Sequence, residues 1–348
     1  MSARFRVGLV PDLLDAAGKP TFGAEPLAVL DGAPEIERVW LAERHTEIPA
    51  ALALEYDALY LTQSRVTRAT VAHVAEGRLK VIARHGVGYD SVDVGAMTEA
   101  GVVVTNTPFA IRRPVATIAM TFILALAGHL FTKDRLTRSG RWHERTSYMG
   151  TGLTGRNLGI VGGGGIGKAL IPLARAFDLR VTVADPYVPA ADIERLGAKL
   201  VPLDTLLAES DFVVIACLLN DDTRALINAE RLARMKPTAY LINVARGPIV
   251  HEPALIEALR ARRIAGAALD VFTNEPVEPD NPLLAMENVI VTPHALCWTD
   301  ECFGNIAREG FAGLVSLARG AAPANVVNRE ALSHPRVKAW LKEGLRTA

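Results

Sequence analysis

Three residues that could carry acid–base chemistry each follow a short apolar run in the second half of the chain. Arg246 lies in INVARGPIV, Glu275 in ALDVFTNEP and His294 in IVTPHA. They would supply a cation, a carboxylate and an imidazole, which are residue types that acid–base chemistry uses. Each also has a plainer interpretation: a solvated turn residue, an acid at a helix start, and one of eight histidines.

The elements around these residues predict an α/β fold. Short β-rich runs alternate with helical stretches, which is typical of βαβ units and parallel sheets. The predicted strands are 5–10, 58–62, 81–83, 102–105, 159–161, 181–184, 212–216, 240–243, 266–270 and 289–292. The predicted helices include 67–76, 115–138, 166–176, 205–209 and 253–261. Because the carboxyl ends of parallel strands line a ligand crevice, three strands would deliver Arg246, Glu275 and His294 to one place.

The length of 348 residues favours two domains. One alternating set fills the first hundred or so residues, a second set begins near Gly159, and the helix 115–138 connects them. The helical end of the chain, from Thr299 onward, could return to the first domain. We therefore expect one domain from residues 1–107 plus 299–348, and a second from residues 108–298.

Composition excludes several classes of protein. The formal net charge is zero and no basic run stands out, which argues against nucleic-acid or anionic-membrane partners. Cys217, Cys297 and Cys302 are too few and too scattered for a disulfide framework or a metal site, and they fit the reducing cytoplasm. The apolar segment 115–131 is at the short limit for spanning a bilayer, and we expect a buried helix there.

A glycine-rich turn follows the predicted strand 159–161. In GIVGGGGIGKAL, Gly162, Gly164 and Gly167 fit the pattern G-x-G-x-x-G, with a helix opening behind it. The first glycine permits a tight turn, the second a close approach to a pyrophosphate, and the third close packing of helix on strand. The amides and dipole of the helix N-terminus favour phosphate binding. The motif thus predicts a dinucleotide site, although glycine-rich turns are also common without one.

The end of the next strand favours NAD over NADP. Asp185 closes VTVAD and is followed by Pro186, with no arginine in the next positions. A carboxylate there accepts hydrogen bonds from the adenosine ribose and repels a 2′-phosphate. The alternative interpretation is an acidic turn residue before proline.

An ordered set of motifs resembles the D-isomer-specific 2-hydroxyacid dehydrogenase family over nearly the whole chain. The motifs are HGVGYDSVD (85–93), GVVVTNTP (101–108), GLTGRNLGIVGGGGIGKAL (152–170), VADPY (183–187), INVARGPIV (242–250), ALDVFTNEP (268–276), TPHA (292–295) and GAAPANVVN (320–328). The resemblance implies two Rossmann-like domains, with the substrate domain built from both chain ends and the NAD-binding domain inserted. It also implies a homodimer joined through the cofactor domain.

The resemblance also implies a role for each matching residue. Arg246 would bind the substrate carboxylate and polarise the C2 oxygen. His294 would be the general acid/base, and Glu275 would form a hydrogen bond with the imidazole ring of His294. Asp270 would orient the nicotinamide carboxamide. The backbone amides of Val87 and Gly88 would hold the substrate carboxylate. The other cofactor contacts implied are Gly165, Ile166, Cys217, Thr223 and Val244.

Several positions depart from the family pattern. The long helix starts with Val115-Ala116-Thr117-Ile118-Ala119, where many relatives carry V-A-E-x-T, and it follows an unusual Arg112-Arg113-Pro114. After the histidine, Leu296, Cys297 and Trp298 replace the small residues that are common there. Arg84, beside His85, could bind a second anionic group of the substrate, or both could be structural. Cys297 could be a thiol nucleophile, although we expect it to pack.

Two other functions remain open on the same scaffold. One is a formate- or phosphite-type dehydrogenase, which would share the glycine motif and Arg246. The other is an NAD-sensing, corepressor-like binding protein, which can retain the arginine, glutamate and histidine without turnover.

Overall fold

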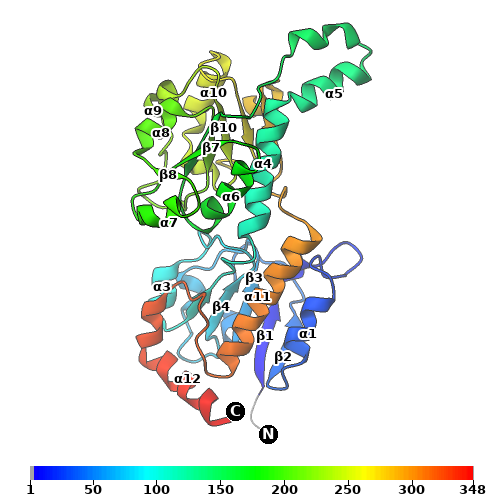
Figure 1. The fold of residues 1–348 in the computed structure, drawn as a ribbon. Coiled ribbons are helices and arrows are strands. Elements are labelled where there is room, and N and C mark those ends of the chain that lie inside the picture. Colours follow the sequence, from blue (N-terminus) through cyan, green and yellow to red (C-terminus); the bar gives the residue numbers. More distant parts are fainter. Residues whose placement is uncertain (1–3, 348) are drawn as a thin grey trace. The chain divides into compact units, whose positions relative to one another are not determined.

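The computed structural model describes residues 4–347, with side chains as far as Leu341. The chain divides into two compact units (Figure 1), Met1–Ile111 with Trp298–Ala348 (unit 1) and Arg112–Cys297 (unit 2). The boundaries expected from the sequence, 107/108 and 298/299, fall within a few residues of these limits.

Unit 1 contains a five-stranded sheet in the order β2-β1-β3-β4-β5, with every pair parallel. Its strands are β1 (Phe5–Leu9), β2 (Ile36–Trp40), β3 (Ala58–Leu61), β4 (Val81–Arg84) and β5 (Val103–Thr105). Its helices are α1 (Ala28–Asp31), α2 (Ala50–Glu55), α3 (Val94–Glu99), α11 (Asp300–Ala318) and α12 (Pro335–Thr347). Phe311 and Leu314 of α11 are fully buried in the same apolar cluster as the central strands.

Unit 2 contains a seven-stranded parallel sheet in the order β12-β11-β10-β9-β6-β7-β8. Its strands are β6 (Asn157–Val161), β7 (Arg180–Ala184), β8 (Lys199–Leu200), β9 (Phe212–Ile215), β10 (Tyr240–Asn243), β11 (Gly266–Leu269) and β12 (Val289–Val291). Its helices are α4 (Arg112–Ala127), α5 (Leu130–Arg138), α6 (Gly165–Arg175), α7 (Ala190–Glu194), α8 (Leu203–Glu209), α9 (Ala229–Arg234) and α10 (Glu252–Arg260). The strand order reverses between β6 and β9, and a doubly wound sheet binds ligands at such a switch point.

The sequence predicted ten of these strands because they are short and apolar, and most of them are largely buried, as strands of parallel sheets are. It missed two edge strands: β2, which contains charged residues, and β8, which has only two residues. The helix predicted over 67–76 was wrong: only a 3₁₀ turn, Arg68–Val71, forms there. The Thr70 hydroxyl donates a hydrogen bond to Ile48 O (2.8 Å), which connects this segment to the loop that contains Ile48.

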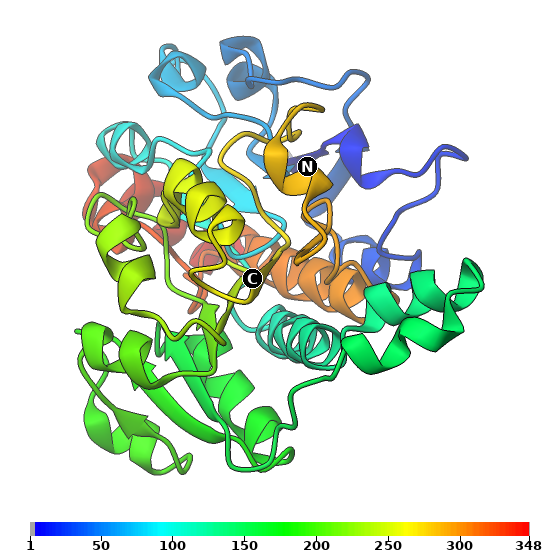
Figure 2. The same cartoon turned by 90° about the horizontal axis from the view of Figure 1, so that it is seen from above.

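The helix predicted over 115–138 is broken in two. His129 adopts a left-handed conformation (φ 51°), and the path of the chain bends by 55° between α4 and α5. α4 is largely buried, as expected. Within residues 4–347, no single helix is long and apolar enough to cross a membrane; only the bent α4–α5 pair would be. Both views show α5 standing out from the rest of unit 2 (Figures 1 and 2).

Candidate active site

His294 and Glu275 form a hydrogen-bonded pair in unit 2. His294 follows β12, and its Nδ1 lies 2.7 Å from Glu275 Oε2. The other oxygen, Oε1, accepts the backbone N–H of Phe272 at 2.9 Å, which fixes the carboxylate. An ionised carboxylate only accepts hydrogen bonds, so Nδ1 carries a proton and Nε2 is the nitrogen left for exchange. Both side chains remain about one-third exposed, at 32% and 34%.

This pair shifts the pKa values of both partners. The hydrogen bond to Glu275 raises the pKa of His294 above its ordinary value, against the opposing effects of burial and the Arg246 charge. Burial raises the pKa of Glu275, but the hydrogen bonds from His294 and Phe272 outweigh it, so that pKa lies below its usual range. The arrangement thus favours an imidazolium beside a carboxylate, as a proton donor requires.

Asp270 anchors the segment that carries His294. It is buried at the end of β11, and its Oδ1 accepts the Thr292 hydroxyl at 2.6 Å and the Ala295 and Leu296 amides at 3.2 Å. These bonds hold residues on both sides of His294, which itself has a left-handed backbone (φ 53°). The sequence singled out Asp270 for the cofactor and missed this bracing role. The signal in the sequence for this role was that Asp270 and Thr292 are polar residues at the ends of apolar strands.

Arg246 follows β10, which is the neighbour of β11 in the sheet. Asn243, fully buried, accepts Ala245 N–H (3.0 Å) and donates to Arg246 O (2.9 Å), so it fixes the turn. The next residue, Gly247, lies so close to the Phe272 carbonyl that a Cβ would approach its carbon to 2.0 Å. The Arg246 turn therefore packs on the segment before Glu275, and its positive charge lowers the pKa values of both Glu275 and His294. Asn243 was missed from the sequence.

The glycine turn after β6 has the geometry that a dinucleotide requires. Gly162 has φ 107°, and a Cβ there would lie 2.6 Å from Cys217 N. A Cβ on Gly167 would lie 2.1 Å from Gly162 O, so only glycine lets α6 approach the strand. A Cβ on Gly164 would meet nothing within 4 Å, which leaves open space over the helix N-terminus. This open cradle fits a pyrophosphate.

Asp185, at the end of β7, is held in front of this turn. Its Oδ2 accepts Gly163 N–H at 2.8 Å, and its Oδ1 accepts the amides of Tyr187 (2.8 Å) and Val188 (3.2 Å). A carboxylate oxygen has two lone pairs, so Oδ2, which accepts one of these three bonds, keeps capacity for a further donor.

A cavity of about 570 Å³ opens beside Asp185 and the glycine turn. Of the predicted cofactor residues, its lining contains Gly162, Gly164, Asp185, Pro186, Cys217 and Thr223. Gly165, Ile166, Gly167, Val244 and Asp270 are outside that lining. Burial raises the pKa of Cys217 to about 11, so its thiol stays neutral. The volume and apolar walls suit an adenosine group.

In unit 1, the predicted substrate loop contains two amide donors that no described residue accepts, the N–H groups of Val87 and Gly88. Their carbonyls are held by Asn106 Nδ2 (2.7 Å) and Arg84 Nε (3.1 Å), respectively. Arg84 is 8% exposed, and its hydrogen bond to Gly88 O stabilises the loop. The sequence proposed direct substrate binding for Arg84 and did not foresee this contact.

His85 packs against Tyr60 of the same unit. Its Nδ1 lies 2.7 Å from the hydroxyl of Tyr60, and its Nε2 is buried with no partner in the described chain. Burial lowers the pKa of His85 to about 3, so the ring is neutral near pH 7. A neutral buried ring does not act as an anion-binding cation.

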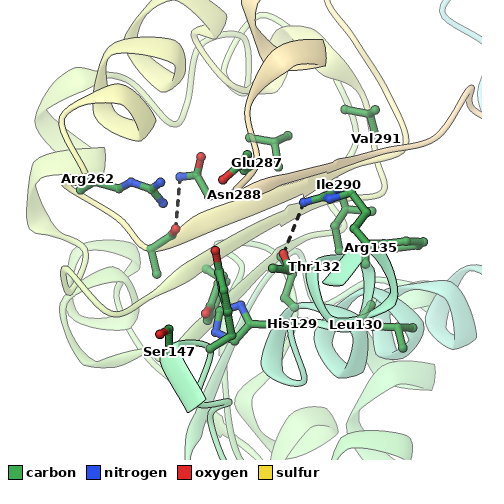
Figure 3. Close-up of a pocket in the computed structure, with 17 residues that line it drawn as sticks. His129, Leu130, Thr132, Arg135, Ser147, Arg262, Glu287, Asn288, Ile290 and Val291 are labelled. Atoms are coloured by element: carbon green, nitrogen blue, oxygen red, sulfur yellow. Dashed lines mark hydrogen bonds between the residues drawn. The ribbon is translucent and has the colours of Figure 1, made fainter. Parts of the chain in front are cut away.

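A second cavity of unit 2, about 370 Å³, lies between α4–α5 and the sheet edge at β12 (Figure 3). His129, Arg135, Arg262 and Glu287 line it, and none of its described lining residues belongs to the predicted site. Among the described residues, no group of three or more histidine, cysteine, aspartate or glutamate side chains could hold a metal ion.

Known proteins resemble this chain over most of its length. Residues 120–295 match the family model for the NAD binding domain of D-isomer specific 2-hydroxyacid dehydrogenases. A glyoxylate reductase of Thermococcus onnurineus is 40% identical over 315 residues, which is 86% of this chain and 91% of that protein. A glyoxylate reductase of Pyrococcus furiosus is 39% identical over 86% of this chain and 90% of that protein.

A solved structure is similar to the chain over nearly its whole length. The PH0520 protein of Pyrococcus horikoshii aligns with a TM-score of 0.80 and 28% identity, covering 97% of this chain and 99% of that one. The chain therefore belongs to the D-isomer specific 2-hydroxyacid dehydrogenase family, as an NAD-dependent oxidoreductase that acts on the CH–OH group of 2-hydroxy acids.

Proposed function

We propose that this enzyme interconverts a small 2-oxo acid and its D-2-hydroxy acid, with His294 as the general acid/base. The single observation that carries the proposal is the 2.7 Å contact between His294 and Glu275. It orients the ring, raises the pKa of His294, and leaves Nε2 to exchange a proton with the C2 oxygen. NADH, when bound, supplies the hydride.

Arg246 and the Val87–Gly88 loop would bind the substrate. The guanidinium of Arg246 would bind the substrate carboxylate and polarise the C2 oxygen, since its fork matches carboxylate geometry. The two unbonded amides of Val87 and Gly88 would hold the same carboxylate. Arg84 would keep this loop in shape through Gly88 O. We accordingly assign unit 1 as the substrate domain and unit 2 as the NAD-binding domain.

Glyoxylate is the first substrate to test, because several relatives about 40% identical to this chain are glyoxylate reductases. The experiment is an NADH-oxidation screen over glyoxylate, hydroxypyruvate, pyruvate, bulkier 2-oxo acids and phosphorylated ones. Saturable turnover of at least one of them is the expected result. Activity with formate or phosphite alone would assign the alternative dehydrogenase, and NADH binding without any turnover would assign a sensing protein.

Asp185 would select NAD. In Asp185→Ala, the Kd for NADH should rise by roughly tenfold or more, because a charged acceptor for the ribose hydroxyls is lost. The Kd for NADPH should change much less, because repulsion of the 2′-phosphate is lost as well. Fluorescence titration with both coenzymes gives the two values. Asp185→Asn keeps one of the two acceptor oxygens and removes the charge, so it shows how much of the loss comes from the charge. Equal losses for both coenzymes in both variants would contradict the assignment.

A homodimer in the cytoplasm completes the proposal. Leu124, Leu130 and Phe131 of α4 and α5 are 41–57% exposed, beside the edge strand β12. These apolar side chains line a surface cavity with Ile290 and Leu296, and a second copy of the chain would cover them. A solution mass of about twice 37.3 kDa is expected by light scattering, and a monomer would contradict this part. Cys217, Cys297 and Cys302 are too few and too scattered for a disulfide framework, which supports a reducing compartment that cell fractionation checks.

A further inference from the structure

Arg112 lies against the first residue of α6, at the place where the cofactor pyrophosphate is expected. A Cβ built on Gly165 would come within 2.5 Å of Arg112 Nε, 2.9 Å of its Cδ and 3.1 Å of its Cγ. The arginine side chain thus passes over Gly165, through the space that any larger residue would fill. We propose that Arg112 is a ligand of the NAD pyrophosphate, and that Gly165 is a glycine in order to admit it.

Two helices create this arrangement. Arg112 is the first residue of α4, which packs against α6. Pro114 lies in the first turn of α4, where a missing N–H is tolerated. Arg113, next to Arg112, is exposed. The two arginines therefore differ in exposure although they are neighbours in sequence: Arg112 is partly buried and lies against Gly165, whereas Arg113 is exposed.

The N-terminus of α6 has open space in which a cation could contact a bound pyrophosphate. Gly164 caps α6 without a side-chain hydrogen bond, and the space over its Cα is open. The nearest other cation of the helix, Lys168, forms an ion pair with Asp192 at 2.8 Å. A pyrophosphate bears negative charge on several oxygens, and a guanidinium fork matches phosphate oxygens in pairs. Arg112 would add this charge to the helix amides.

The inference rests on NAD binding, which the family establishes, and is independent of the roles proposed for His294 and Arg246. In Arg112→Gln, the Kd for NADH should rise by roughly tenfold or more, by titration of coenzyme fluorescence. Arg113→Gln is the matched control, because it removes the same charge one residue away, and should leave the Kd unchanged.

Cofactor fragments show which part of the coenzyme Arg112 contacts. ADP contains the pyrophosphate and adenosine does not. Arg112→Gln should weaken ADP binding, measured by calorimetry, and leave adenosine binding as it is. Equal weakening of both fragments would mean a structural role and would overturn the proposal, as would unchanged or tighter binding of NADH.

Gly165 provides a second, independent test. Gly165 has no positive φ, so alanine is compatible with its backbone, but the added Cβ must displace Arg112. Gly165→Ala should therefore weaken NADH binding to a similar extent, and should cause little further loss when combined with Arg112→Gln. Losses that multiply in the double variant would show that the two residues act separately, against the proposal. Circular dichroism melts of each variant confirm that the fold is kept.

Discussion

Replacing His294 with glutamine should lower kcat for 2-oxo acid reduction by roughly a hundredfold or more, the usual scale for a positioned acid/base. Glutamine keeps the size of the side chain and a hydrogen-bonding end, but it cannot donate a proton to the C2 oxygen. NADH binding should be unchanged, because His294 is outside the lining of the cavity beside Asp185. Steady-state kinetics and coenzyme titration measure the two quantities.

A pH profile separates proton transfer from a structural role. Reduction needs protonated His294, so the rate holds below the pKa of the ring and falls as pH rises through it. Glu275 raises that pKa, so in Glu275→Gln the alkaline fall of kcat should move to lower pH. His73→Gln, at an exposed site, should alter neither rate nor profile. Full turnover in His294→Gln would show that another group moves the proton.

Arg246→Gln should lower kcat/KM by roughly tenfold to a hundredfold, because a charge-assisted hydrogen bond to the substrate carboxylate is lost. Arg246→Lys should recover only part of the loss, since an ammonium is a point charge without the paired donors. The arginine also opposes the raised pKa of His294, so Arg246→Gln should move the alkaline limb to higher pH. Kinetics over a pH series report both effects.

The matched control for Arg246 is Arg263→Gln, an exposed arginine of the same unit. It should leave kcat/KM and the pH profile unchanged. If the Arg246 variants lost only thermal stability while kcat/KM held, the arginine would be a structural residue of the turn that Asn243 and Gly247 form.

The sequence predicted the centre of each sheet and the residues at its carboxyl edge. A strand such as FVVI or YLIN is recognisable because parallel strands are buried on both faces and therefore apolar throughout. Arg246 and His294 stand out because each is polar directly after such a run. Edge strands such as β2, with its exposed Glu37, lack that signal.

What the sequence could not predict depends on contacts between distant residues. The break between α4 and α5 depends on the left-handed backbone of His129, which histidine adopts more often than most residues but which a histidine alone does not predict. Asp270, buried at the end of β11, was recognised by type, but its bonds to Thr292, Ala295 and Leu296 follow only from the packing of β11 on β12. Arg112 was noticed as unusual, yet only the packing of α4 on α6 places it at Gly165.

Building unit 1 from both ends of the chain affects how a newly made molecule can mature. On the ribosome, β1 to β5 emerge early, whereas Phe311 and Leu314, which complete their apolar cluster, emerge some two hundred residues later. Unit 2 is continuous and can fold while synthesis proceeds. The amino-terminal sheet therefore passes through translation with an uncovered apolar face, and the nascent chain is most prone to misassociation until α11 has been made.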